Sequence, residues 1–153
     1  MNDLILKSLE VGTMKSLYPN GVSAQTDQTS FTAAAGTIYA VTDLDGCAIT
    51  LPAPSAGDRI KFYIADATSN THTVTSDAST TLYSGVVLTT DLIDGTTGKN
   101  FVFVPDGSND RIITLNGTTT GNSAVLEFVG LDSNTWHVEG TIFGSGNVVT
   151  CFS

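Results

Sequence analysis

The sequence predicts an all-β fold, a single compact sandwich or small barrel of roughly nine to eleven short strands. Short β-rich segments recur between strong turn signals from residue 37 to residue 142. Only 14% of the residues are charged, and Thr, Gly, Ser, Asn and Asp supply the polarity, which suits strands and turns. Glutamate, which favours helices, occurs only as Glu10, Glu127 and Glu139.

The chain of 153 residues has the usual size of one domain and can bury a core without staples. We divide it into an N-terminal arm over residues 1–30 and a β-sandwich or barrel domain over residues 31–153. Cys47 lies in an apolar strand pattern and Cys151 lies near the end of the chain. A core of this size needs no bridge, so we expect both to be reduced thiols.

The clearest strand is segment 59–65, RIKFYIA, in which polar and apolar residues alternate. Segments 124–129 and 135–142 are expected to form a hairpin with a longer loop. Residues 77–98 are ambiguous, with small strands around Leu82 and residues 86–88. Further strands are expected over 37–42, 47–51, 71–76 (a polar strand), 100–104 and 111–115, and around Val148 and Val149. The alternation in segment 59–65 directs Ile60, Phe62 and Ile64 to one side of the strand and Arg59, Lys61 and Tyr63 to the other.

The first 30 residues differ from the rest because apolar groups precede the turn Tyr18-Pro19-Asn20-Gly21, while Gly12 prevents one long helix. They form either an extended arm that pairs with the sheet edge of a second subunit or shell protein, or an ordinary first strand or two of the domain. Apolar groups in such number usually mark an interaction site, so we carry the arm forward as the hypothesis. The candidate partner-binding residues are Leu4, Ile5, Leu6, Leu9, Val11, Met14, Leu17 and Tyr18.

The net charge of −9 and the scattered positions of the six Lys and Arg residues argue against a nucleic-acid partner and an anionic membrane surface. The N-terminus carries neither a basic leader nor a long apolar run, so we predict no membrane span and synthesis in the cytoplasm.

No residue pattern predicts catalysis, a cofactor or a metal. The sequence has two histidines and no GxSxG, so no nucleophile has an evident base, and His137 is expected on the polar face of its strand. Glu127 and Glu139 are expected near each other on the last hairpin, as exposed acids rather than a catalytic pair. The segment from Asp106 to Asp110 begins like a calcium loop, but Arg111 and Gly117 stand where Gly and Glu are needed.

Most aromatic residues stand at alternating strand positions and are expected in the core. Trp136 should be buried on the last hairpin together with Phe128 or Leu126. Tyr63 and Tyr83 are the alternative case, since either ring could stack on a sugar.

Two stretches carry a resemblance: Gly36 to Ile64, GTIYAVTDLDGCAITLPAPSAGDRIKFYI, and Phe128 to Gly140, FVGLDSNTWHVEG. An aromatic strand, a D-G turn, an apolar strand ending in Leu-Pro and a Gly before a Phe-bearing strand resemble small β-modules of tailed-bacteriophage virion proteins. Such modules are found in capsid decoration proteins and in parts of tail fibres.

The resemblance implies a non-enzymatic capsid decoration, or cement, protein that binds the outer face of an assembled shell. Its partners would be the major capsid protein or another virion protein, and its own copies in a homotrimer. Its location would be the capsid surface of the virion, after synthesis in the host bacterial cytoplasm. The alternatives are a tail- or head-fibre tip module that binds a host glycan, and a carbohydrate-binding module of a cell-surface protein.

Overall fold

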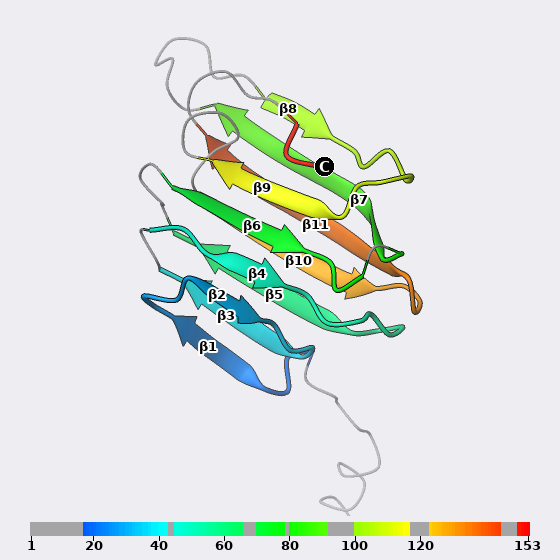
Figure 1. The fold of residues 1–153 in the computed structure, drawn as a ribbon, viewed down its shortest axis with the longest axis horizontal. Coiled ribbons are helices and arrows are strands. Elements are labelled where there is room, and N and C mark those ends of the chain that lie inside the picture. Colours follow the sequence, from blue (N-terminus) through cyan, green and yellow to red (C-terminus); the bar gives the residue numbers. More distant parts are fainter. Residues whose placement is uncertain are drawn as a thin grey trace, which may run out of the picture.

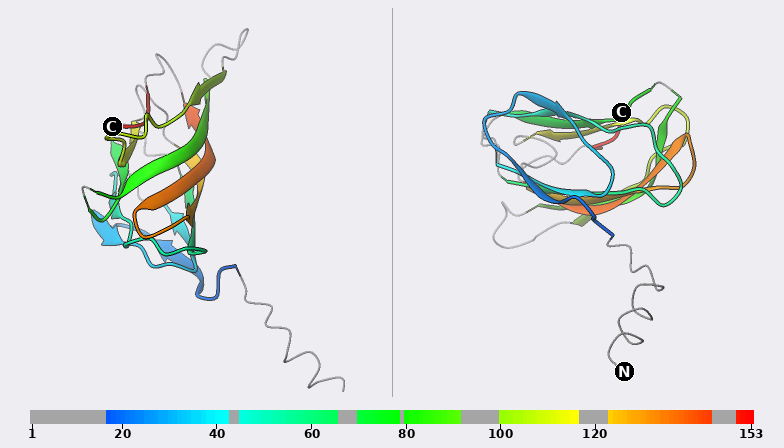
Figure 2. Two further views of the ribbon diagram at one scale, coloured as in Figure 1. Left: turned by 90° about the vertical axis from the view of Figure 1, so that its right-hand side faces the viewer. Right: turned by 90° about the horizontal axis from the view of Figure 1, so that it is seen from below.

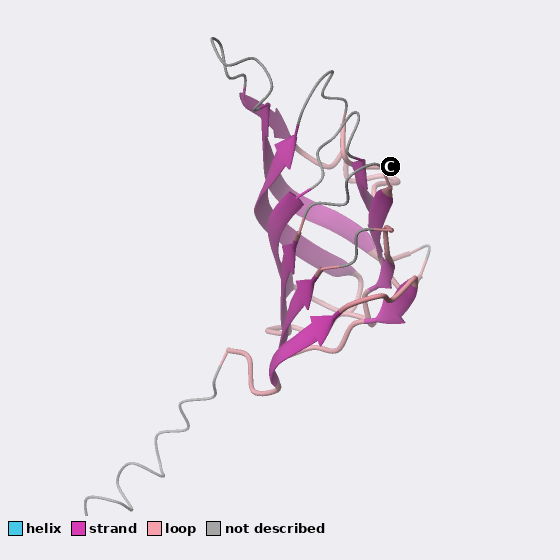
Figure 3. Cartoon of the chain, turned by 90° about the vertical axis from the view of Figure 1, so that its left-hand side faces the viewer, coloured by secondary structure: helices cyan, strands magenta, loops and turns pink. Residues whose placement is uncertain are grey.

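The computed structural model describes residues 17–42, 45–65, 70–78, 80–91, 100–116, 123–144 and 150–153, in which it shows strands and no helix (Figures 1 and 3). Seven strands form one sheet in the order β1-β3-β5-β10-β11-β7-β8, and four form the other in the order β2-β4-β6-β9. The sheets pack as two layers, which confirms the predicted all-β sandwich (Figure 2). The strands are β1 Gly21–Gln25, β2 Ser30–Thr32, β3 Thr37–Val41, β4 Ala48–Thr50, β5 Arg59–Ile64, β6 Thr71–Thr75, β7 Leu82–Asp91, β8 Asn100–Phe103, β9 Ile112–Asn116, β10 Ser123–Gly130 and β11 Thr135–Gly144.

The first half of the chain winds between the two sheets in flattened coils. Strands β1, β3 and β5 pair in parallel in the large sheet, while β2, β4 and β6 pair in parallel in the small one. The register sets Gly21 beside Thr37 and Thr37 beside Ile60, so the first coil is shorter than the second. Unequal coils leave no fixed period in the sequence, which explains why the winding was not predicted from it.

The second half closes the sandwich with antiparallel pairs. Strands β10 and β11 form the predicted hairpin, and β10 also pairs with β5, which joins the two halves of the large sheet. Residues 150–153 cover the outer edge of β9, where Ile112 and Ser153 exchange backbone hydrogen bonds. The last strand that we predicted, around Val148 and Val149, lies outside the described residues.

The core lies between the sheets and contains a chain of aromatic rings. Phe62 contacts Tyr39 and Phe128 at centroid distances of 5.4 and 5.7 Å, and Phe128 meets the edge of Trp136 at 6.4 Å. Trp136 is fully buried, as predicted, and its Nε1 donates to the Pro52 carbonyl at 3.1 Å.

Three expectations require correction. The two small strands expected around Leu82 and residues 86–88 are one, because β7 runs unbroken from Leu82 to Asp91. Segment 71–76 is not simply polar, since β6 directs His72 and Val74 into the core. Tyr83, considered as a sugar-stacking residue, is buried and donates its hydroxyl hydrogen to the Val74 carbonyl at 2.9 Å.

The N-terminal segment is divided by the structure. Residues from Gly21 onward already belong to the sheets, as β1 and β2, so the strands begin earlier than the expected boundary at residue 30. For these residues the alternative of an ordinary first strand or two applies. Six of the candidate partner-binding residues lie outside the described residues: Leu4, Ile5, Leu6, Leu9, Val11 and Met14.

Candidate functional site

Strand alternation determines which side chains of the large sheet point away from the core. On β5, Arg59, Lys61 and Tyr63 point outward, as predicted from the sequence. The strand registers align such outward positions into rows across the sheet. One row comprises Val22, Ile38, Lys61, Glu127, Glu139 and Val86, and the next comprises Ala24, Ala40, Tyr63, Val125, Thr141, Leu88 and Val102. We call this surface the outer face.

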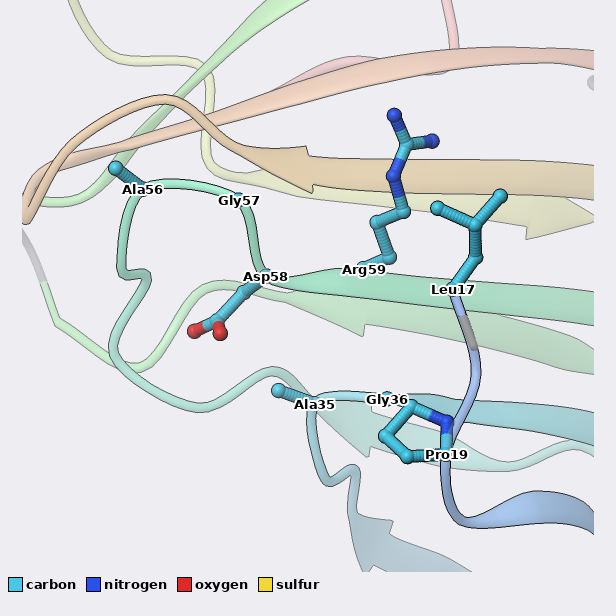
Figure 4. A pocket seen from close by; sticks show the side chains of 8 residues that line it. All are labelled: Leu17, Pro19, Ala35, Gly36, Ala56, Gly57, Asp58 and Arg59. Atoms are coloured by element: carbon cyan, nitrogen blue, oxygen red, sulfur yellow. The ribbon is translucent and has the colours of Figure 1, made fainter. Parts of the chain in front are cut away.

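The outer face gathers almost all of the exposed large apolar side chains among the described residues. Val104 continues the alternation of β8 just beyond its end, and Leu17 lies beside Arg59 (Figure 4). Leu131 is the exception, in the turn between β10 and β11. The members within strands are Val22, Tyr63, Val86, Val102 and Phe143. A concentration of apolar groups on one surface is typical of an interaction site.

The opposite face of the molecule has a different chemistry. None of the exposed large apolar side chains of the described residues lies on the strands of the four-stranded sheet. Its outward positions carry no charge and, except for Ile112, are small or polar: Ser30, Thr32, Ala48, Thr50, Thr71, Thr73, Thr75, Ile112, Thr114 and Asn116. The sandwich therefore presents an apolar side and a hydroxyl-rich side.

One half of the outer face carries balanced charges. Arg59 Nη1 lies 2.7 Å from Glu127 Oε1, and both side chains are about one-third exposed. His137 places Nε2 at 3.2 Å from Glu139 Oε1 and Nδ1 at 3.2 Å from Ser84 Oγ. Glu127 and Glu139 are direct partners in the β10–β11 register, as expected. The two cations Arg59 and Lys61 balance the two anions Glu127 and Glu139, so this half is close to neutral in a chain of net charge −9.

The chain enters the sandwich over this charged half. Tyr18 lies beside Glu127, and burial together with this acidic neighbour raises the pKa of Tyr18 to about 12. Asn20 Nδ2 donates to the Ala35 carbonyl at 2.8 Å, and its backbone N–H donates to the Gly36 carbonyl. A shallow pocket of about 340 Å³ lies between this segment and the turn before β5, lined by Leu17, Pro19, Ala35, Gly36, Ala56, Gly57, Asp58 and Arg59 (Figure 4).

The other half of the outer face carries no charged side chain among the described residues. The Lys61 ammonium lies over the Tyr63 ring at 5.2 Å from its centroid and marks the border between the halves. Tyr63 and Phe143 flank an apolar hollow of about 280 Å³ across β3, β5, β10 and β11. Val102, 63% exposed, ends the row on β8.

Of the predicted partner-binding residues, the structure places two, Leu17 and Tyr18, and both lie against the outer face. The rest of this surface was not predicted as a site. The outward direction of Tyr63 was visible in the sequence, but its alignment with Val125 and Val102 depends on strand registers.

The other motifs remain local. Asp106 accepts hydrogen bonds from the backbone and hydroxyl of Ser108 and from the Asn109 backbone, which lower the pKa of its carboxyl group. The carboxylate thus closes a turn. Over the described ranges there is no group of three potential metal ligands and no helix suited to crossing a membrane.

Cys47 and Cys151 are both buried thiols, as predicted.

Burial raises the pKa of Cys151 from 9.0 to about 12. Since the unfolded thiol ionises first, ionisation favours unfolding, and the free energy of unfolding should fall as the pH rises from about 9 towards 12. Urea unfolding at several pH values measures this. Cys151→Ala should reduce the slope of the free energy of unfolding against pH to the part that the tyrosines with raised pKa contribute. An unchanged slope would contradict the assignment to Cys151.

No protein-family model, no curated protein and no solved structure matches the chain.

Proposed function

We propose that this protein is a non-enzymatic structural protein of a bacteriophage virion, which decorates the capsid by binding the outer face of the shell. The observation that best supports this is the gathering of exposed apolar side chains on one face of the large sheet, over which the N-terminal segment enters the fold. An apolar, nearly neutral face on an acidic chain suits contact with protein. The sequence resemblance supplies the class of partner, the major capsid protein or another virion protein.

The N-terminal segment is the proposed shell contact. Tyr18 lies beside Glu127, and Asn20 donates hydrogen bonds to the carbonyls of Ala35 and Gly36, so the segment from Leu17 onward is held against the sandwich. The apolar residues from Leu4 to Met14 supply main-chain and side-chain groups for pairing with a shell protein. Many copies on one particle raise the effective affinity well above that of a single segment.

Deleting residues 1–16 tests this proposal. The truncated chain keeps the contact of Tyr18 with Glu127 and the hydrogen bonds of Asn20, so its melting temperature should change little. Its binding to particles assembled from the major capsid protein of the same genome should fall by about tenfold or more, because every copy then lacks the proposed shell contact. Co-sedimentation with the particles measures the binding.

The matched control is Thr50→Lys, on the hydroxyl-rich side, which should bind particles like the full chain. If the truncated chain unfolds, residues 1–16 belong to its own core. If it folds and binds particles as tightly as the full chain, the shell contact lies elsewhere on the sandwich.

A glycan-binding fibre tip is the second candidate, and one observation favours it. Tyr63 is 46% exposed and borders the apolar hollow that Phe143 also lines. An exposed ring beside a hollow can stack on a sugar. A glycan array distinguishes the two functions, because the fibre-tip function requires a signal that Tyr63→Ala removes and the decoration function does not.

A further inference from the structure

The outer face has an arrangement that is complementary to itself. Its seven strands are ordered symmetrically about β10, with β5 and β11 on either side, then β3 and β7, then β1 and β8. A two-fold axis along β10, between two facing copies, would set β5 of one copy against β11 of the other, β3 against β7 and β1 against β8. Strand β10 would face its own copy, and each row would face the same row of the second copy. The chemistry of such a pairing can therefore be followed residue by residue.

Lys61 and Glu139 are complementary under this operation, while Glu127 on β10 would lie on the axis and face its own counterpart, with Arg59 of the same chain 2.7 Å from each Glu127. Lys61 on β5 and Glu139 on β11 occupy the same row, each one strand from β10. Each Lys61 would therefore face Glu139 of the second copy, giving two symmetric ion pairs close to the axis. Because the face itself is nearly neutral, two acidic chains can meet there with little repulsion.

Side-chain sizes are complementary in the neighbouring row. Val125 lies on the axis and would meet its own counterpart. Tyr63 would face Thr141, Ala40 would face Leu88, and Ala24 would face Val102. Each pair sets a large side chain against a small one, which is how packed layers interdigitate.

The area reaches the lower end of the range for specific dimers. Six intervals of about 4.8 Å between seven strands and three intervals of about 6.7 Å between four outward rows give a face of roughly 29 by 20 Å. That is roughly 600 Å² per partner, where the range of specific protein interfaces begins.

From these observations we propose that a second copy of this chain covers the outer face, in a two-fold dimer whose two large sheets pack face to face. This assignment deepens the proposed function and rests on the same face, and it gives the virion protein a dimeric rather than a trimeric unit. Tyr18 lies against Glu127 of the axis strand, so the base of each N-terminal segment would form part of this interface.

Sedimentation of the full-length protein tests the dimer. Val125→Lys places two ammonium groups on the axis and should weaken the dimer by about tenfold or more, while leaving the melting of the monomer little changed. Thr50→Lys adds the same charge to the hydroxyl-rich side and should leave the dimer intact.

A charge exchange tests the predicted pairing itself. Lys61→Glu alone and Glu139→Lys alone should each weaken the dimer by about tenfold, because like charges then face each other. The double variant Lys61→Glu with Glu139→Lys should recover most of the loss, and added salt should reduce these differences.

A full-length protein that stays monomeric or forms a trimer would overturn the dimer. Loss of the dimer in Thr50→Lys but not in Val125→Lys would also overturn it. So would a double variant that dimerises no more tightly than the single variants. Failure of the dimer is distinct from failure of the proposed function. A monomer that binds particles refutes only the dimer, whereas a dimer that ignores particles refutes only capsid decoration.

Discussion

Replacing Trp136 with alanine should lower the free energy of unfolding by about 3–5 kcal/mol, the usual cost of emptying a large aromatic site. The indole is fully buried, packs edge-on against Phe128 and donates to the Pro52 carbonyl, which ties β11 to the segment after β4. Urea unfolding followed by circular dichroism measures the loss, since the variant has no tryptophan left.

Trp136→Phe is the control for this prediction. It retains a ring against Phe128 but removes the hydrogen bond to Pro52, so about 1–3 kcal/mol should be lost. Native fluorescence of the unmodified protein should be that of a buried indole. Emission at the wavelength of an exposed indole, or an alanine variant as stable as the parent, would contradict the described core.

Replacing Gly85 with alanine should be comparably severe. Gly85 lies inside β7 at φ +108°, where an added Cβ would stand 2.0 Å from the carbonyl oxygen of Val138 on β11. The backbone strain and the overpacking each cost about 1–3 kcal/mol, so we expect a loss of about 2–6 kcal/mol or failure to fold. Chemical unfolding, or the yield of soluble protein, gives the result.

Gly107→Ala separates the two causes of that loss. Gly107 also has a positive φ, of +76°, but a Cβ there would meet no atom within 4 Å. Only the conformational cost of about 1–2 kcal/mol should remain. Equal losses at Gly85 and Gly107 would show that β7 and β11 do not approach each other as described.

Local patterns in the sequence were sufficient to predict most strands. The alternation of segment 59–65 gave β5 and its two sides, and the D-S-N turn between two apolar runs gave the β10–β11 hairpin. Strand β7 was predicted as two small strands because Gly85 interrupts its pattern between Tyr83 and Val86. Strand β1 was left as one of two alternatives because GVSAQ, an edge strand with mostly exposed side chains, has little apolar alternation to detect.

The candidate site was less predictable because it depends on contacts between distant strands. Leu17 and Tyr18 were selected for their apolar character, but their position against Arg59 and Glu127 follows from the parallel winding of β1, β3 and β5. The row from Ala24 to Val102 comes from seven strands whose order differs from their order in the chain. No local pattern carries that information.

The most direct test of the outer face as the association surface is the labelling of single introduced cysteines. The native thiols Cys47 and Cys151 are buried, so Lys61→Cys, Val102→Cys and Thr50→Cys each provide one accessible thiol. Maleimide labelling is compared between protein diluted until it sediments as a monomer and protein bound to capsid particles. Our account predicts that the cysteines at positions 61 and 102 become protected on the particles while the cysteine at position 50 stays reactive. Protection at position 50, with unchanged reactivity at positions 61 and 102, would contradict it.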